Sequence, residues 1–207
     1  RCAEEHPAIQ LRITEGLSTA LVDWIRSSRV DLAVIYYLND PPSGLVAEPI
    51  AQEELMFVES GTAEKRVGPV SFEEVCRYPL IMPGVPHGLR LVVDQCARAH
   101  DYEFQVPFEM QSVPVILELI QLGLGCGILP HGAIAAKIAS GHVNATRIVD
   151  PSIDRTMSLV YRDNRELSKA ELVLKALLVE QVAAATWRKD HLGIPKQSVS
   201  NRAKPTL

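Results

Sequence analysis

The fold is decided by residues 9–37, which read IQLRITEGLSTALVDWIRSSRVDLAVIYY. Apolar and polar side chains alternate over Ile9–Ile13, which is the pattern of a strand with one buried face. A turn at Gly16 leads to Ser18, a good N-cap for a helix whose apolar residues recur at helical spacing. The unbroken apolar run Leu32–Tyr37 is typical of a strand covered on both faces of a parallel sheet. The stretch therefore predicts a strand, a helix and a second strand in βαβ order.

The same alternation of strands and helices continues along the rest of the chain. Ser71 with Glu74, and again Ser168 with Glu171, have the spacing of a capping box, which marks the start of a helix. The second of these helices is expected to run to about 187. The residues expected on its buried face are Leu172, Val173, Ala176, Leu177 and Val182. Further strands are expected at 45–50, 54–58, 80–82, 106–111, 126–129, 145–149 and 156–161, and further helices at 89–99, 113–122 and 133–138.

These elements form two clusters, which indicates two lobes. The chain leaves the first lobe near residues 50–53 and returns near 150–163, so two strands act as a hinge. We expect an α/β fold of two Rossmann-like lobes, with lobe one at 1–50 and 162–190, lobe two at 51–161, and a disordered tail at 191–207. Open α/β lobes bind ligands beyond the carboxyl ends of their strands, so two facing lobes predict a cleft for a small molecule.

The composition is that of a globular protein and argues against several classes. The 207 residues are 47% hydrophobic and 22% charged, with a formal net charge of -4. A surface of that charge lacks the positive field that duplex DNA binding requires. No stretch approaches the length of a membrane-spanning helix, and no apolar signal core follows Arg1. We therefore expect a cytoplasmic protein that makes no contact with a membrane.

The cysteines and histidines lack the spacing of a metal site. Cysteines stand at positions 2, 76, 96 and 126, too far apart in sequence for a zinc knuckle or a redox dithiol. The six histidines include no closer pair than His131 and His142. We expect reduced, mostly buried thiols, no metal and no cofactor.

The glycine-rich stretch Gly123-Leu-Gly-Cys-Gly127 has the composition of a nucleotide-binding loop but the wrong context. It follows an expected helix and leads into an expected strand. Phosphate-binding loops have the reverse order, because the helix N-terminus must face the phosphate. A glycine C-cap followed by a tight turn accounts for this stretch.

Ser18 lies at a strand–turn–helix corner, where hydrolases place a nucleophilic serine. Two features argue against this reading. Ala20 stands where the hydrolase motif has its last glycine, and no downstream acid or histidine has a recognisable setting. The alternative is a helix N-cap that also donates a hydrogen bond to a ligand.

Two further corners expose helix N-termini, where free N–H groups favour anions. One is Pro83–Arg90, in which His87 is either a ligand contact or a loop histidine that faces water. The other is Ser112-Val113-Pro114, which opens a long apolar helix. A small organic acid, an amino acid or an inorganic anion would suit such helix ends.

Several motifs, taken in order, resemble the effector-binding domain of LysR-type transcriptional regulators over about residues 1–190. They are Glu15-Gly-Leu-Ser18 followed by Leu21, Arg29-Val-Asp-Leu-Ala-Val34, the acidic strand Glu53–Val58, Gly123–Pro130 and the late helix at Ser168. Arg90–Val93 and Thr156–Tyr161 further resemble the nitrogen-assimilation regulators of this family.

The resemblance implies a periplasmic-binding-protein-like fold of type II with an effector in the cleft. It also implies a homodimer or tetramer without catalysis, and DNA binding only through a winged helix-turn-helix that precedes this chain. The family's first strand of lobe one and the loop after it would lie upstream of Arg1, which leaves the sheet of lobe one short of a strand. The ligand contacts carried over by the resemblance are Ser18, Tyr36, Met82, Pro83, His87, Ser112, Val113 and Pro130.

The sequence thus favours an effector-sensing and oligomerisation domain of a transcriptional regulator. A free-standing solute-binding protein would share the two-lobed clamp and is the second hypothesis. A serine hydrolase that uses Ser18 is the third.

Overall fold

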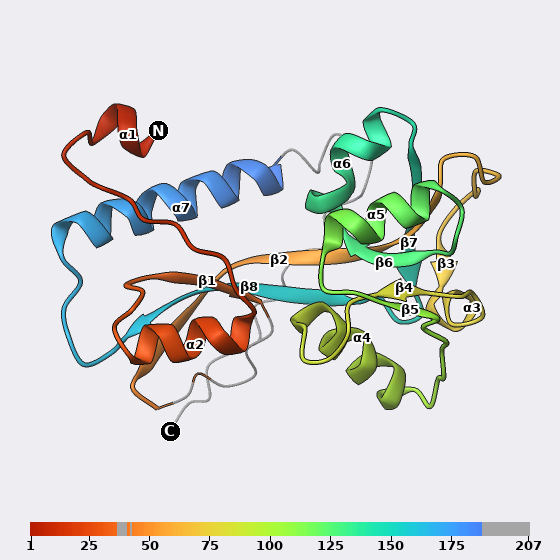
Figure 1. Ribbon diagram of the computed structural model, residues 1–207, viewed down its shortest axis with the longest axis horizontal. Coiled ribbons are helices and arrows are strands. Elements are labelled where there is room, and N and C mark those ends of the chain that lie inside the picture. The colour runs from red at the N-terminus through yellow and green to blue at the C-terminus, as the bar shows by residue number, and fades with distance from the viewer. Residues whose placement is uncertain (37–40, 42, 188–207) are drawn as a thin grey trace, which may run out of the picture.

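The computed structural model describes residues 1–36, 41 and 43–187, and it has two lobes joined by two long strands (Figure 1). The joining strands are β2 (Leu45–Ser60) and β8 (Asp154–Arg162). Lobe one adds α1 (Cys2–Glu5), α2 (Ser18–Arg26), β1 (Ala33–Tyr36) and α7 (Lys169–Trp187). Lobe two adds β3 (Val70–Ser71), α3 (Phe72–Val75), β4 (Ile81–Met82), α4 (Gly88–Ala99), β5 (Phe108–Glu109), α5 (Val113–Gln121), β6 (Gly127–Pro130), α6 (His131–Ala139) and β7 (Val143–Val149).

The two joining strands run side by side from one lobe into the other. They pair antiparallel from Leu45 opposite Arg162 to Glu54 opposite Asp154, with a register shift between Pro49 and Ala51. Beyond Glu54, β2 pairs with β6 and β7 in lobe two, whereas residues 157–160 of β8 pair with β1 along the edge opposite β2. The strand order is therefore β1-β8-β2-β7-β3, and β4 and β5 form a separate parallel pair.

One expectation about these strands needs correction. The strands expected at 45–50 and 54–58 are one continuous strand, because β8 supplies hydrogen-bond partners through the residues between them. Residues 157–160 of β8 pair with β1, and Val160 packs in the core of lobe one. The second crossing therefore lies near 154–156, inside the expected range of 150–163, and the exact lobe boundaries stay a prediction.

The strand expected at Ile9–Ile13 is not formed, so the predicted βαβ unit is wrong. Leu11 is 42% exposed and Ile13 is 91% exposed, and the structure assigns 9–17 to neither helix nor strand. A strand needs a neighbour for its backbone N–H and C=O groups. No described strand pairs with the edge of β1 that faces away from β8. Moreover, β1 pairs antiparallel with β8 rather than in a parallel sheet.

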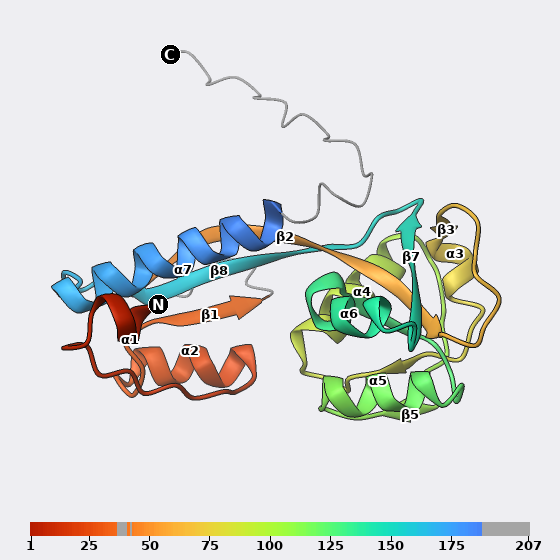
Figure 2. The same ribbon diagram turned by 90° about the horizontal axis from the view of Figure 1, so that it is seen from above.

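Each lobe has its own hydrophobic core. The core of lobe one lies between the sheet and α2, where Val22 and Ile25 pack against Ile35 and Val160. Figure 2 shows α7 on the opposite face of this sheet. The larger core of lobe two includes Leu55, Phe57, Phe72, Ile81, Ile116, Ile120 and Ile128, all fully buried.

The helix ends follow the sequence only in part. Both capping boxes are confirmed: the backbone N–H groups of Glu74 and Glu171 donate to the hydroxyls of Ser71 and Ser168. Ser18, in contrast, is the first residue of α2 rather than its N-cap, and Ser112 makes no side-chain capping bond at α5. A serine at a corner therefore did not predict a cap by itself.

The helix α7 runs as expected from 169 to 187, but the prediction of which of its residues are buried is partly wrong. Leu177 is buried, whereas Leu172 is 51% exposed and Ala176 is also exposed. The expected tail at 191–207, and the last residues expected in lobe one, 188–190, lie outside the described residues.

All four cysteines are free, and Cys76 is buried whereas the other three are half-buried. Burial raises the pKa of the Cys76 and Cys126 thiols to about 11, which keeps both protonated near neutral pH. Within the described ranges no three acidic, histidine or cysteine side chains gather where they could hold a metal ion. The helices of those same ranges include none long and apolar enough to span a membrane.

Candidate functional site

Four polar side chains and one glycine, from both lobes and from both joining strands, lie close together where the lobes join. We call this group the junction cluster: Tyr36 at the end of β1, Glu53 on β2, Arg155 on β8, His87 before α4, and Gly132 in the first turn of α6. The antiparallel register places Glu53 directly opposite Arg155, which is why residues 102 positions apart form a pair.

Arg155 is the centre of the junction cluster. Its Nε and Nη2 donate to Oε2 of Glu53 at 2.9 and 2.7 Å. The centre of its guanidinium lies 3.8 Å from the centroid of the Tyr36 ring, a cation–π contact. The Arg155 side chain is 9% exposed and that of Glu53 is 13% exposed. The ion pair is therefore largely withdrawn from water and stacked beneath an aromatic ring.

His87 is the N-cap of α4, a role that neither sequence interpretation foresaw. Its Nδ1 accepts a hydrogen bond from the backbone N–H of Leu89 at 3.2 Å. Because Nδ1 is an acceptor, the neutral ring carries its proton on Nε2. Burial, and then the nearby charge of Arg155, lower the pKa of His87. His87 therefore presents a neutral N–H donor on the side away from its helix.

The two charges of the ion pair act on Tyr36 in opposite directions. Burial raises the pKa of the Tyr36 phenol, the Glu53 carboxylate raises it further, and Arg155 lowers it. The phenol stays protonated near neutral pH, where it can both donate and accept a hydrogen bond.

Other predicted contacts are placed less favourably for a ligand. Met82 is fully buried, and Pro83 and Pro130 are buried as well. The Pro83 carbonyl accepts a hydrogen bond from Arg90 at 3.5 Å. Ser112 is exposed and Val113 is half-buried at the start of α5. Of the predicted residues, the structure brings Tyr36 and His87 together with the ion pair.

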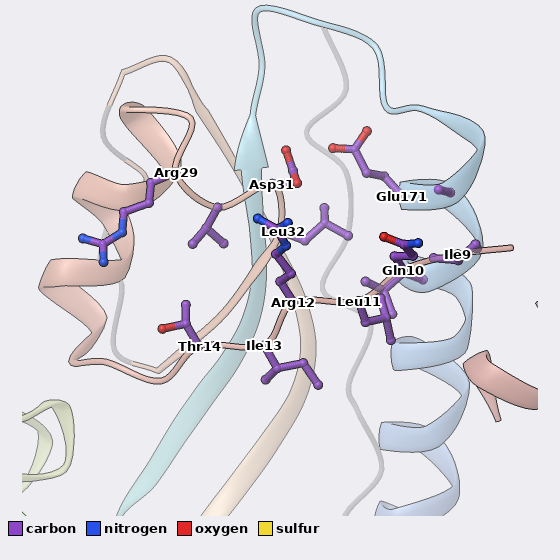
Figure 3. Close-up of a pocket in the computed structure, with 13 residues that line it drawn as sticks. Ile9, Gln10, Leu11, Arg12, Ile13, Thr14, Arg29, Asp31, Leu32 and Glu171 are labelled. Carbon is purple, nitrogen blue, oxygen red and sulfur yellow. The ribbon is translucent and has the colours of Figure 1, made fainter. Parts of the chain in front are cut away.

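Ser18 lines a groove inside lobe one, away from the other predicted residues except Tyr36. The groove lies between residues 9–16, the outer edge of β1 and α7, and comprises adjoining cavities of about 550 and 490 Å³. Figure 3 shows that the first cavity is bordered by the segment 9–14 on one side and by Asp31 and Leu32 on another. Its walls belong to one lobe only.

The geometry lacks the arrangement of a serine hydrolase at Ser18. Among the residues that the structure describes, no hydrogen bond joins Ser18 to a histidine or a carboxylate. A nucleophilic serine needs such a base within hydrogen-bond reach. The junction cluster offers binding groups instead: a cation, a carboxylate, a phenol and a neutral N–H donor.

Sequence reasoning missed Glu53 and Arg155 as site residues. The acidic strand Glu53–Val58 was considered only as one of the motifs that resemble the LysR-type regulators. Neither residue lies at a helix N-terminus or a glycine turn, the two features used to choose candidates. Only the register of β2 against β8 shows that the two charges face each other.

The chain matches the family model of the LysR substrate binding domain over residues 1–183. The nitrogen assimilation regulatory protein nac of Klebsiella aerogenes is 25% identical over 179 residues, which are 86% of this chain and 58% of that protein. This chain thus spans about six tenths of the length of that relative. The relatives that match are transcriptional regulators.

Solved structures share the two-lobed fold. The effector binding domain of QuiR in complex with shikimate has a TM-score of 0.75 at 19% identity, over 87% of this chain and 85% of that one. The regulatory domain of CcmR from Synechocystis PCC6803 in complex with 2-PG has a TM-score of 0.76 at 17% identity, over 87% and 86%. Together with the match over residues 1–183, this likeness shows that the chain belongs to the LysR substrate-binding domain family, with the type II periplasmic-binding-protein-like fold.

Proposed function

We propose that this chain is the effector-sensing and oligomerisation domain of a cytoplasmic transcriptional regulator. It binds a small molecule between its lobes and passes the binding free energy to a DNA-binding winged helix-turn-helix elsewhere in the protein. The assembly is a homodimer or a tetramer. DNA contact falls to the other domain, since the present one has a net charge of -4.

One observation carries this proposal: two lobes with separate cores are joined by β2 and β8, and the junction cluster draws side chains from both lobes. Tyr36 comes from lobe one and His87 from lobe two, while Glu53 and Arg155 lie on the joining strands. A molecule that touches all four side chains would hold the two lobes in one relative position.

Such a ligand acts on the regulator through a difference in affinity. It shifts the balance between open and closed lobes only by the amount that it binds one form more tightly. The same coupling then acts on any domain whose position depends on the lobes. QuiR with shikimate and CcmR with 2-PG, both bound to small molecules, support this mode of action for the fold.

A thermal-shift screen of the 207-residue chain against a metabolite panel tests the proposal, with isothermal titration calorimetry on every hit. A ligand at a hundred times its Kd is expected to add about 2.7 kcal/mol to the free energy of unfolding. Tyr36→Phe should weaken binding of that hit, because it removes the junction hydroxyl. Tyr102→Phe, the same change in lobe two at a ring that packs on Phe72, is the matched control and should bind normally. A panel that leaves the melting temperature unchanged throughout would overturn the proposal.

A further inference from the structure

The ion pair of the junction cluster is only half complete. Arg155 directs both of its bonds, from Nε and Nη2, to the same oxygen, Oε2 of Glu53. Among the described residues, Oε1 of Glu53 accepts no hydrogen bond and Nη1 of Arg155 donates none. Paired guanidinium and carboxylate groups often form two parallel bonds that use both oxygens. Among the described residues, the acceptor Oε1 of Glu53 and the donor Nη1 of Arg155 therefore have no hydrogen-bond partner.

This incomplete pairing matters because both side chains are largely buried. Arg155 is 9% exposed and Glu53 is 13% exposed. Charges withdrawn from water are costly unless further hydrogen bonds satisfy their remaining donors and acceptors. A ligand that supplies the missing acceptor and the missing donor would therefore bind with charge-assisted hydrogen bonds.

The open carboxylate oxygen lies beside Gly132, the only glycine of α6. A Cβ placed on Gly132 would come within 3.2 Å of Oε1 of Glu53. Gly132 is itself exposed, so this side of the carboxylate borders the surface of lobe two. A residue with a side chain at this position would cover the oxygen.

The charge of the cluster restricts what can bind there. Arg155 and Glu53 sum to zero, and the neutral His87 and Tyr36 add no charge. A simple anion that reached Arg155 would also meet the Glu53 carboxylate, and like charges at close range repel strongly. A simple cation at Glu53 would meet Arg155 in the same way. A ligand with both charges satisfies both groups and leaves the site neutral.

We propose that the junction cluster selects an α-amino acid in its zwitterionic form. Its carboxylate binds Arg155, with the Nε2–H of His87 and the hydroxyl of Tyr36 as further donors, and its ammonium group donates to Oε1 of Glu53. The inference rests on the proposed function and narrows the effector to one chemical class.

The test measures binding of three matched series to the 207-residue chain by titration calorimetry: the common L-α-amino acids, their carboxamides and the corresponding 2-oxo acids. At least one amino acid should bind. Its carboxamide, which lacks the anion, and its 2-oxo acid, which lacks the ammonium, should each bind roughly tenfold more weakly, since each loses one charge-assisted hydrogen bond.

Two variants locate the effect at Glu53. Glu53→Gln keeps an oxygen for Arg155 but removes the negative charge, so the preference for the amino acid over its 2-oxo acid should disappear. Gly132→Ala leaves the ion pair in place, favours the helix, and places a methyl group against Oε1. It should weaken amino acid binding without lowering the melting temperature of the unliganded protein. If Glu53→Gln fails to fold, the test rests on Gly132→Ala: unchanged amino acid binding by this variant would then overturn the inference. Glu54→Gln, the same change at the neighbouring residue that pairs with Arg147, is the control and should keep the preference.

The outcomes separate this inference from the proposed function. Equal binding of an amino acid and its 2-oxo acid would show a plain anion site and overturn the inference alone. If a metabolite of another class binds and none of the amino acids does, the inference of an amino acid effector is overturned, whereas the proposed function stands. Absence of binding by every metabolite would overturn both.

Discussion

The two lobes differ in how closely the side chains in their interiors are packed. Lobe two buries a cluster of 22 residues, with helices packed against both its sheet and its loops. Among the described residues the core cluster of lobe one has six, and this lobe contains the groove between residues 9–16, β1 and α7. Close packing on all sides gives a residue its full share of dispersion and hydrophobic stabilisation. We infer that lobe two is the rigid half of the clamp and lobe one the half that opens locally at lower free energy.

The largest expected difference between the lobes comes from matched core truncations. Ile120→Ala in lobe two removes a fully buried side chain that packs against Gly127, and should cost about 4–5 kcal/mol. Ile35→Ala in lobe one removes an equally buried side chain from the smaller core, which can relax into the space, and should cost about 2–3 kcal/mol. Urea denaturation of both variants measures the two losses.

The control for these truncations is Val67→Ala, since Val67 is fully exposed and should change the free energy of unfolding by less than about 0.5 kcal/mol. Equal losses for Ile120→Ala and Ile35→Ala would contradict the claimed difference between the lobes.

A smaller effect is expected at the start of α7, which packs against β2 in lobe one. The Glu171 carboxylate accepts hydrogen bonds from Arg165 and from the backbone of Ser168, and the Arg165 guanidinium is the main reason that its pKa falls to about 2. Glu171→Gln should lower the free energy of unfolding by about 1–2 kcal/mol near neutral pH. Glu166→Gln, at an exposed residue of the same loop, is the control and should have almost no effect.

The pH dependence of this contribution follows from the lowered pKa. The unfolded carboxyl group titrates near its ordinary value of about 4.3, above its folded pKa. The stabilisation is therefore fully present above that value and is lost as the pH falls toward about 2. Chemical denaturation of the wild type and of Glu171→Gln across this range should show two curves that converge at low pH. Parallel curves would contradict the assignment.

The smallest effect is expected in lobe two, at the cap of α4. His87→Ala removes the Nδ1 acceptor for the backbone N–H of Leu89 and should cost about 1 kcal/mol, whereas His87→Asn keeps an acceptor and should cost little. The folded pKa of His87 lies below its ordinary value, so its neutral form contributes stability that is present above about pH 6.5 and lost as the pH falls. Thermal unfolding as a function of pH should show this loss in the wild type and not in His87→Asn. An unchanged wild-type curve would rule out the capping role.

The patterns that predicted most reliably were those whose causes are local. The capping boxes at Ser71 and Ser168 hold because the hydroxyl and the N–H that it binds are three residues apart. Gly123, the expected glycine C-cap, ends its helix with a φ of +75°, a backbone conformation that favours glycine. The strand at Ile9–Ile13 failed because alternation states which face is buried but cannot provide a neighbouring strand.

The sequence by itself identified the family, through the motifs that resemble it, and it predicted most of the helices and strands that follow residue 17. Those elements could be predicted because they depend on periodicity, caps and turns within short stretches. It also placed Tyr36 and His87 at the ends of elements that border the junction. Only the tertiary structure decided that Glu53 faces Arg155, that Arg155 lies over the Tyr36 ring, and that Glu53 lies beside Gly132. The physical reason is register: a pair of charges 102 residues apart in sequence meets only when two long strands align, and no local pattern encodes that alignment.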